Sequence, residues 1–242
     1  MEVLLIVFVA TLIRSTFGFG EALVAVPLLA FCIPLEVAAP LAVLVSITVA
    51  GIVVVQDWSE IHLRSTGWLV LSTLFGIPLG LLLLTSSHHR VVKATLGAII
   101  IAFSIYSLVG RAPLELKHDS RALLLVSGFC AGVLGGAYGM NGPPLVVYGA
   151  MRRWSPQHFR ATLQGYFLPA SIIGMGGYWL AGLWTPLVTR YYLLSLPVTL
   201  LGVLLGRMIN HRLHGERFLK YIYAGLAGIG ALLLAQAITG GR

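Results

Sequence analysis

Long apolar segments, separated by short polar loops, fill almost the whole of this 242-residue sequence. About 20 apolar residues are enough for a helix to cross the hydrocarbon core of a bilayer. Helices satisfy their own backbone hydrogen bonds in lipid, so the sequence predicts an all-α polytopic membrane protein with about eight segments. The segments cover residues 3–33, 37–55, 68–84, 92–109, 123–151, 159–183, 187–208 and 218–238.

The first and fifth segments are longer than one span requires, and glycine interrupts both. Residues 18–20 read GFG, and residues 135–144 read GGAYGMNGPP. Inside a helix, glycine costs about 1 kcal/mol and proline about 3 kcal/mol. Pro144 also disfavours helical geometry in the residue before it. We therefore expect unwound backbone at both places, either as a kink for close helix packing or as a transporter binding site.

The two halves of the chain, residues 1–110 and 121–242, look like repeats that together form one membrane domain. Each half begins with a glycine-broken segment and continues with three ordinary apolar segments. The motif GxxxG at residues 76–80 returns 126 positions later at residues 202–206. A basic pair also returns after 127 positions, as Arg90 and Lys93 and then as Arg217 and Lys220. GxxxG permits close helix packing, within one chain or in a homodimer, and packing within the chain is the simpler interpretation.

The Lys and Arg residues indicate how the chain is oriented. If all eight segments span, nine of these residues face one side and six face the other. If the broken segments are re-entrant hairpins, the counts become eleven and four, with Arg90, Lys93, Arg190 and Arg242 in the minority. The hairpin arrangement obeys the positive-inside rule better and makes the halves inverted repeats. Both arrangements place the N- and C-termini on the non-cytoplasmic side, and the sequence leaves the choice open.

The net charge of +8 would suggest nucleic acid in a soluble protein. Only 10% of these residues are charged, however, against about 25% in soluble domains. The basic residues lie mostly in short loops, where membrane topology accounts for them. We therefore expect a small anionic substrate and membrane lipid as partners, and no nucleic acid.

Two ionisable residues, Arg14 and Glu21, flank the glycine break of the first segment. A charge at the centre of a membrane helix costs about 2.5–3.5 kcal/mol on insertion scales, which makes each a functional hypothesis. One interpretation is a structural ion pair that pins the broken segment. The other assigns Arg14 to an anionic substrate and makes Glu21 a candidate proton carrier.

The second break offers polar groups without a charge. Asn141 supplies an amide, and exposed backbone N–H groups of neighbouring residues can line a concave anion site. Gln164, near the start of the sixth segment, is more often a helix–helix hydrogen bond than a ligand. The candidate substrate-binding residues are Arg14, Gly18, Gly20, Gly139, Asn141, Gly142 and Gln164. The sequence contains no HExxH, GxSxG or GxxxxGK[ST] motif, so we expect no metal, cofactor or catalytic residue.

These motifs make the chain resemble the TauE/SafE sulfite exporter family. The resemblance rests on residues 18–20, on AVPLL at residues 25–29, on GGAYGMNGPPL at residues 135–145 and on FRATL at residues 159–163. It covers nearly the whole chain, although Glu21 stands where the family usually has glycine or another small residue. The resemblance implies a permease of the bacterial inner membrane that moves sulfite or sulfonate-like organosulfur compounds, usually outward.

The leading hypothesis is therefore a secondary transporter that exports small anions. An anion channel with the same pore is the first alternative, and flux that cannot be driven uphill would favour it. A membrane-embedded enzyme is the second alternative, which the lack of clustered nucleophiles, metal ligands or acid pairs disfavours.

Overall fold

The structure is a computed structural model whose described part is helical and contains no strand. It describes residues 1–56, 63–86, 89–109, 116, 120–152, 156–210, 224, 227–228, 230–231, 233–235 and 237–238. The helices in that part are α1 (Glu2–Phe17), α2 (Glu21–Leu29), α3 (Leu35–Gln56), α4 (Leu63–Leu84), α5 (His89–Val109), α6 (Arg121–Tyr138), α7 (Gly142–Met151), α8 (Pro156–Leu180) and α9 (Pro186–Asn210).

Five of these helices, α3, α4, α5, α6 and α9, are long and apolar enough to cross a membrane by length and composition. The helical membrane class predicted from the sequence is thereby confirmed. The expected eighth segment, residues 218–238, lies largely outside the described residues.

Glycine ends a helix at both predicted breaks. Gly18, with φ of 85°, closes α1, and Gly20, with φ of 96°, precedes α2. Gly139, with φ of 67°, closes α6. This left-handed conformation strains every residue with a Cβ, which is why glycine occupies these positions. The predicted unwinding is confirmed, but the second break is shorter than the sequence suggests: α7 already begins at Gly142, because proline is tolerated in a first helical turn.

Each broken segment folds back on itself. The Cys32 thiol, just beyond α2, donates to Glu2 Oε2 at the start of α1 over 3.5 Å. In the second half, Leu116 N, ahead of α6, donates to the carbonyl of Met151 at the end of α7 over 3.0 Å. We call α1 with α2 hairpin 1 and α6 with α7 hairpin 2.

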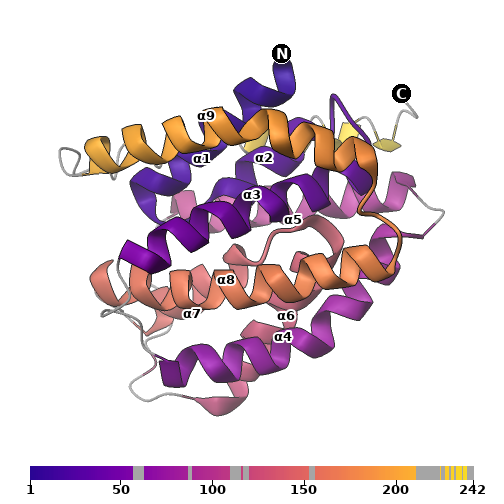
Figure 1. Ribbon diagram of the computed structural model, residues 1–242. Coiled ribbons are helices and arrows are strands. Elements are labelled where there is room, and N and C mark those ends of the chain that lie inside the picture. The colour runs from indigo at the N-terminus through magenta and orange to yellow at the C-terminus, as the bar shows by residue number, and fades with distance from the viewer. Residues whose placement is uncertain are drawn as a thin grey trace.

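The helices form a row in which α9, α3, α8 and α4 follow one another, with α1 packed on α9 and α6 packed on α4 (Figure 1). Thr73 of α4 shares a hydrogen bond of 2.7 Å with Tyr166 of α8. Further along, a Cβ at Gly177 would lie 3.4 Å from Ile77 Cγ2. Helices α4 and α8 therefore run in the same direction. Eight simple spans would place the third and sixth segments antiparallel, so this direction favours hairpins.

Glycine seams join each long hairpin helix to its neighbour. On α4, a Cβ at Gly76 would lie 2.2 Å from the carbonyl oxygen of Phe129 on α6, and one at Gly80 would lie 2.1 Å from that of Val133. On α9, a Cβ at Gly206 would lie 2.5 Å from Ser15 Cβ on α1. Both GxxxG motifs thus serve packing within the chain, as predicted. The homodimer stays a prediction.

Replacing Gly80 with Ala is expected to destabilise the protein by about 1–3 kcal/mol or more, because the new methyl group overlaps the backbone of α6. Gly67, on the same helix, is a matched control, since a Cβ there meets no atom of the described residues within 4 Å. Gly67→Ala should be neutral or slightly stabilising. Thermal unfolding in detergent measures the stability of both variants. Equal unfolding midpoints for the two would contradict the close packing of α4 on α6 at Gly80.

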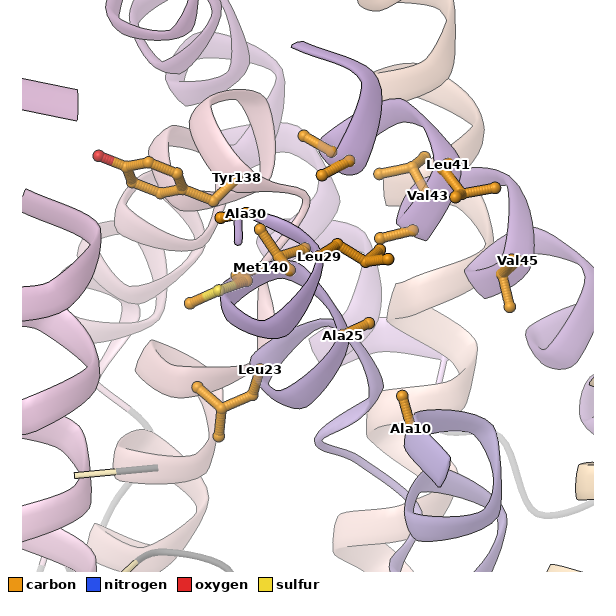
Figure 2. Packing of buried hydrophobic residues seen from close by; sticks show 14 of the residues in the cluster. Ala10, Leu23, Ala25, Leu29, Ala30, Leu41, Val43, Val45, Tyr138 and Met140 are labelled. Atoms are coloured by element: carbon orange, nitrogen blue, oxygen red, sulfur yellow. The ribbon is translucent and has the colours of Figure 1, made fainter. Parts of the chain in front are cut away.

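The short helix α2 is enclosed by the core. Figure 2 shows Leu23, Ala25 and Leu29 of α2 packed among buried side chains that include Ala10 and Met140. A helix that is apolar on every side is stable only when it is surrounded by protein or lipid. This enclosure fixes where the N-terminal end of α2 points, and hence where Glu21 lies.

Candidate functional site

A small cavity lies where the two hairpin breaks meet. Its volume is about 30 Å³, which is room for one or two water molecules. The lining comes from both breaks and from α3, α5 and α8: Arg14, Phe19, Gly20, Glu21, Ala22, Leu23, Ser46, Phe103, Gly139, Met140, Asn141, Gly142, Pro143 and Phe167.

Two helix N-termini border this cavity. Helix α2 begins at Glu21 and α7 begins at Gly142, and both residues line the cavity. The first N–H groups of a helix have no partner within the helix, and the helix dipole makes this end positive. Two such ends on one cavity form an environment that attracts an anion.

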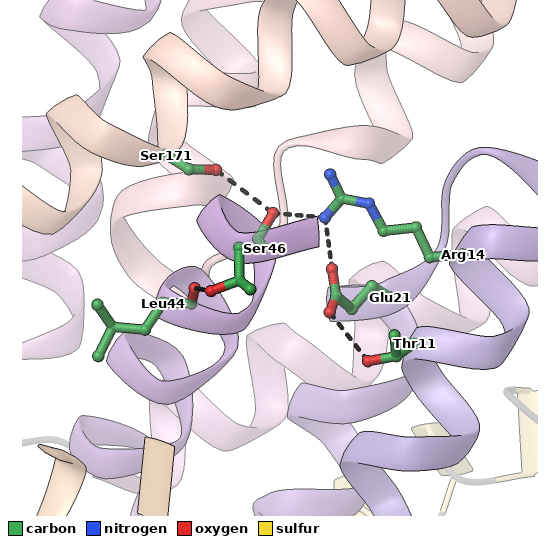
Figure 3. Close-up of polar contacts among 7 residues, drawn as sticks. Thr11, Arg14, Glu21, Leu44, Ser46 and Ser171 are labelled. Carbon is green, nitrogen blue, oxygen red and sulfur yellow. Dashed lines mark hydrogen bonds and ion pairs between the residues drawn. The ribbon is translucent and has the colours of Figure 1, made fainter. Parts of the chain in front are cut away.

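Arg14 is the centre of the polar contacts on hairpin 1 (Figure 3). Its Nη1 donates to Glu21 Oε2 and, over 2.6 Å, to Ser46 Oγ on α3. Thr11 Oγ1 donates to the other carboxylate oxygen of Glu21 over 3.4 Å. Ser171 of α8 donates to Ser46 over 3.4 Å. The network therefore connects the broken segment to two helices of the central row.

The ion pair is almost fully buried, with 4% of the Arg14 side chain and 3% of the Glu21 side chain exposed. Burying both charges removes water from each of them, and their mutual attraction repays that cost only with good geometry and added hydrogen bonds. In this conformation Glu21 neutralises Arg14. An anion that binds Arg14 would therefore compete with a carboxylate that already offsets the charge, unless that carboxylate takes up a proton.

Hairpin 2 contributes uncharged groups to the cavity, and tyrosine side chains of α8 contact this hairpin. Asn141 is 8% exposed and lies within hydrogen-bonding reach of the Tyr166 hydroxyl. The Tyr178 hydroxyl donates to the carbonyl of Gly135 over 2.8 Å. A Cβ at Gly135 would lie 3.0 Å from Asn141 Nδ2, so glycine there leaves room for the amide. The Asn141 side chain is thus positioned from two sides.

The structure brings together most of the candidate residues from the sequence. Those that line the cavity are Arg14, Gly20, Glu21, Gly139, Asn141 and Gly142. Gly18 lies outside the lining and instead closes α1 with an N–H that donates to the carbonyl of Arg14 over 2.6 Å. The backbone of Gln164 belongs to α8, but its side chain lies outside the described residues.

Sequence reasoning missed Ser46 and three phenylalanines, Phe19, Phe103 and Phe167, all of which line the cavity. Ser46 left a weak signal, since it is one of two hydroxyl residues in the otherwise apolar stretch 37–55. The phenylalanines left none, because an aromatic residue in an apolar segment is ordinarily a packing residue.

Two comparisons with known proteins gave matches. A family model described as "Sulfite exporter TauE/SafE" matches residues 3–234. A curated protein of Cupriavidus necator, described as "Probable sulfite/organosulfonate exporter TauE", is 28% identical over 184 residues, which is 76% of this chain and 70% of that protein. No solved structure matches the chain.

Proposed function

Because this chain belongs to the sulfite exporter TauE/SafE family, we propose that it exports sulfite or an organosulfonate through the cavity between its two hairpins. Members of the family are membrane transporters, so this chain is a transporter and not an enzyme. The observation that carries the substrate class is that the buried Arg14 and two helix N-termini line one cavity. Discontinuous helices that present such ends to an anion are a recurrent design of secondary transporters.

The size of the cavity supports a secondary transporter over an anion channel. A cavity of about 30 Å³ holds one or two water molecules, and sulfite, with four heavy atoms, is larger. The cavity in this conformation is therefore too small to hold the anion. A channel conducting in this conformation would need a wider path, whereas a transporter passes through a closed state in each cycle.

In the proposed site, Arg14 supplies the charge and the glycines let backbone N–H groups approach the anion. Gly20 and Gly142 line the cavity at the N-terminal ends of α2 and α7. The second and third residues of α7 are Pro143 and Pro144, which have no N–H, so only Gly142 among its first three residues can donate. Asn141 adds a side-chain amide, and Gly139 provides the turn that places it. Gln164 stays a candidate on α8.

Glu21 is the proposed proton carrier. Its carboxylate contacts Arg14 directly, so a proton on Glu21 would release the guanidinium for the substrate. Binding of the anion and protonation of Glu21 would then favour each other, which is the thermodynamic basis of coupling two ligands.

We also propose that residues 1–110 and 121–242 are inverted repeats. In such a repeat, α1 corresponds to α6, α3 to α8 and α4 to α9. The observed contacts fit this correspondence: α4 packs on α6 as α9 packs on α1, and α4 packs on α8 as α9 packs on α3. The hydrogen bond between Ser46 and Ser171 lies where α3 meets α8, which the correspondence maps onto itself. With two hairpins, eleven Lys and Arg residues lie on one side of the membrane, and the positive-inside rule makes that side the cytoplasmic side of the bacterial inner membrane. Both termini then lie on the other side.

Purified protein in proteoliposomes tests the function. Sulfite loaded inside should exchange with external sulfite, saturate with concentration and accumulate against its gradient when an ion gradient is imposed. Flux that resists saturation and cannot be driven uphill would favour the channel. A protein that moves neither sulfite nor methanesulfonate would overturn the proposed substrate class.

Replacing Asn141 with Leu is expected to lower sulfite flux about 10-fold to 100-fold, because an amide that faces the anion is replaced by an apolar group of similar size. The measurement is initial exchange rate in proteoliposomes. Thr199→Val is the control, since the Thr199 hydroxyl is buried outside the cavity and has no hydrogen-bond partner among the described residues. Wild-type flux in Asn141→Leu would remove Asn141 from the site.

A further inference from the structure

Phe167 of α8 lies between the two hairpins. Its ring centre is 5.1 Å from Arg14 Cζ, so the guanidinium of hairpin 1 lies over the aromatic face. On the other side, a Cβ at Gly142 would lie 3.8 Å from Phe167 Cζ, so the ring edge reaches the first residue of α7. The side chain is buried, with 7% exposed, and it lines the cavity.

The neighbours of Phe167 keep this ring in place. Tyr166 packs against it edge to face, with ring centres 5.8 Å apart and planes at 64°. Tyr166 is itself held by its hydrogen bond to Thr73 on α4. One turn further along α8, Ser171 contacts Ser46, which bonds to Arg14. The ring is therefore part of a wall built from three helices and does not stand free in the cavity.

We propose that Phe167 determines the specificity of this transporter by setting the largest anion that the site accepts. This inference rests on the proposed function and assigns a size limit to the same site. The ring fills the space between the positive group that would hold the anion and the N-terminal end of α7 that faces it. An anion bound to Arg14 that carries a bulky organic group would have to place that group where the phenyl ring lies.

Removing the ring should turn that space into a pocket for an aromatic group. An apolar cavity of roughly 150 Å³ is large enough to bind benzene in a protein core, and Phe167→Ala deletes a whole phenyl ring beside the existing cavity. Benzenesulfonate then presents a sulfonate to Arg14 and a ring to the vacated space. The same substitution removes the aromatic face under the guanidinium, which should weaken sulfite binding only about threefold.

The test is binding to full-length protein in detergent, by calorimetry, with sulfite, ethanesulfonate and benzenesulfonate as probes. Wild type should bind sulfite and reject benzenesulfonate. Phe167→Ala should shift the benzenesulfonate-to-sulfite affinity ratio at least 10-fold towards benzenesulfonate. Phe167→Leu, which keeps more of the packing, should admit ethanesulfonate and still reject benzenesulfonate. Met175→Ala is the matched control, since Met175 is buried on the same helix outside the cavity, and its ratio should equal that of wild type.

The outcomes separate this inference from the function on which it rests. Wild-type protein that binds none of the three anions would overturn the proposed function. If wild type binds sulfite but the benzenesulfonate-to-sulfite affinity ratio is unchanged in both Phe167→Leu and Phe167→Ala, the proposed role of Phe167 is overturned and the proposed function is not. A ratio that changes equally in Met175→Ala would also overturn it, because general loosening of α8 would then explain the result.

Discussion

Replacing Arg14 with Gln is expected to lower sulfite flux about 30-fold or more. Arg14 is the cation that lines the cavity in the described part of the chain, and the N-terminal residues of α2 and α7 line the same cavity. Truncating one partner of a buried, hydrogen-bonded charge pair costs about 2–5 kcal/mol in complexes, and each 1.4 kcal/mol is tenfold in affinity. Initial rates of sulfite exchange in proteoliposomes measure the loss. Arg190→Gln, at an exposed site on α9, is the control and should retain wild-type flux.

The same substitution is expected to destabilise the fold, because Glu21 would keep a buried charge without its partner. Breaking a buried pair on one side costs about 3–5 kcal/mol. The double variant Arg14→Gln with Glu21→Gln removes both charges, so it should recover most of the stability while flux stays low. Recovery of flux in the double variant would contradict a role of Arg14 in binding and would leave the pair with a structural role only.

Replacing Glu21 with Gln alone is expected to separate transport from the proton gradient. If one proton moves with each anion cycle, a pH difference of one unit can sustain an anion gradient of about tenfold, since both are worth about 1.4 kcal/mol. Gln cannot release a proton, so Glu21→Gln should exchange sulfite and yet build no gradient. Uphill accumulation of sulfite in proteoliposomes at imposed pH differences gives the measurement.

Two results would decide against this role for Glu21. Accumulation by Glu21→Gln equal to that of wild type would place the coupling elsewhere. Accumulation by wild type that ignores the pH difference, but follows another ion, would exclude a proton as the coupled species. Glu36→Gln provides a matched acidic control, because Glu36 lies in the first turn of α3, away from the cavity between the hairpins.

The sequence predicts the breaks well because they are local. Glycine at positions 18, 20 and 139 adopts positive φ angles that other residues resist, so composition alone marks where α1 and α6 end. The exact start of α7 was less predictable. Pro143 and Pro144 disrupt the interior of a helix but suit its first turn, and only the position of Gly142 in three dimensions decides between the two.

Whether the broken segments cross or fold back depends on contacts that are distant in sequence. The approach of Cys32 to Glu2 and of Leu116 to Met151 decides the question, and no local pattern contains it. The same holds for the site. Arg14 and Glu21 were identifiable because charge is rare at depth, whereas Phe167 became visible only when α8 was placed between the hairpins.

The two glycine seams restrict how this protein can change shape. At the seam of α4 with α6, backbone meets backbone, as between Gly80 and Val133, and at the seam of α1 with α9, Gly206 lies against Ser15 Cβ and the carbonyl of Leu12. Such contacts cannot slide without large clashes, so α4 with α6 and α1 with α9 behave as two rigid bodies. Each body contains one helix from either half of the chain. A movement of the N-terminal half relative to the C-terminal half would have to separate α4 from α6 and α1 from α9. A rearrangement that keeps both seams intact would carry α1 together with α9 and α6 together with α4.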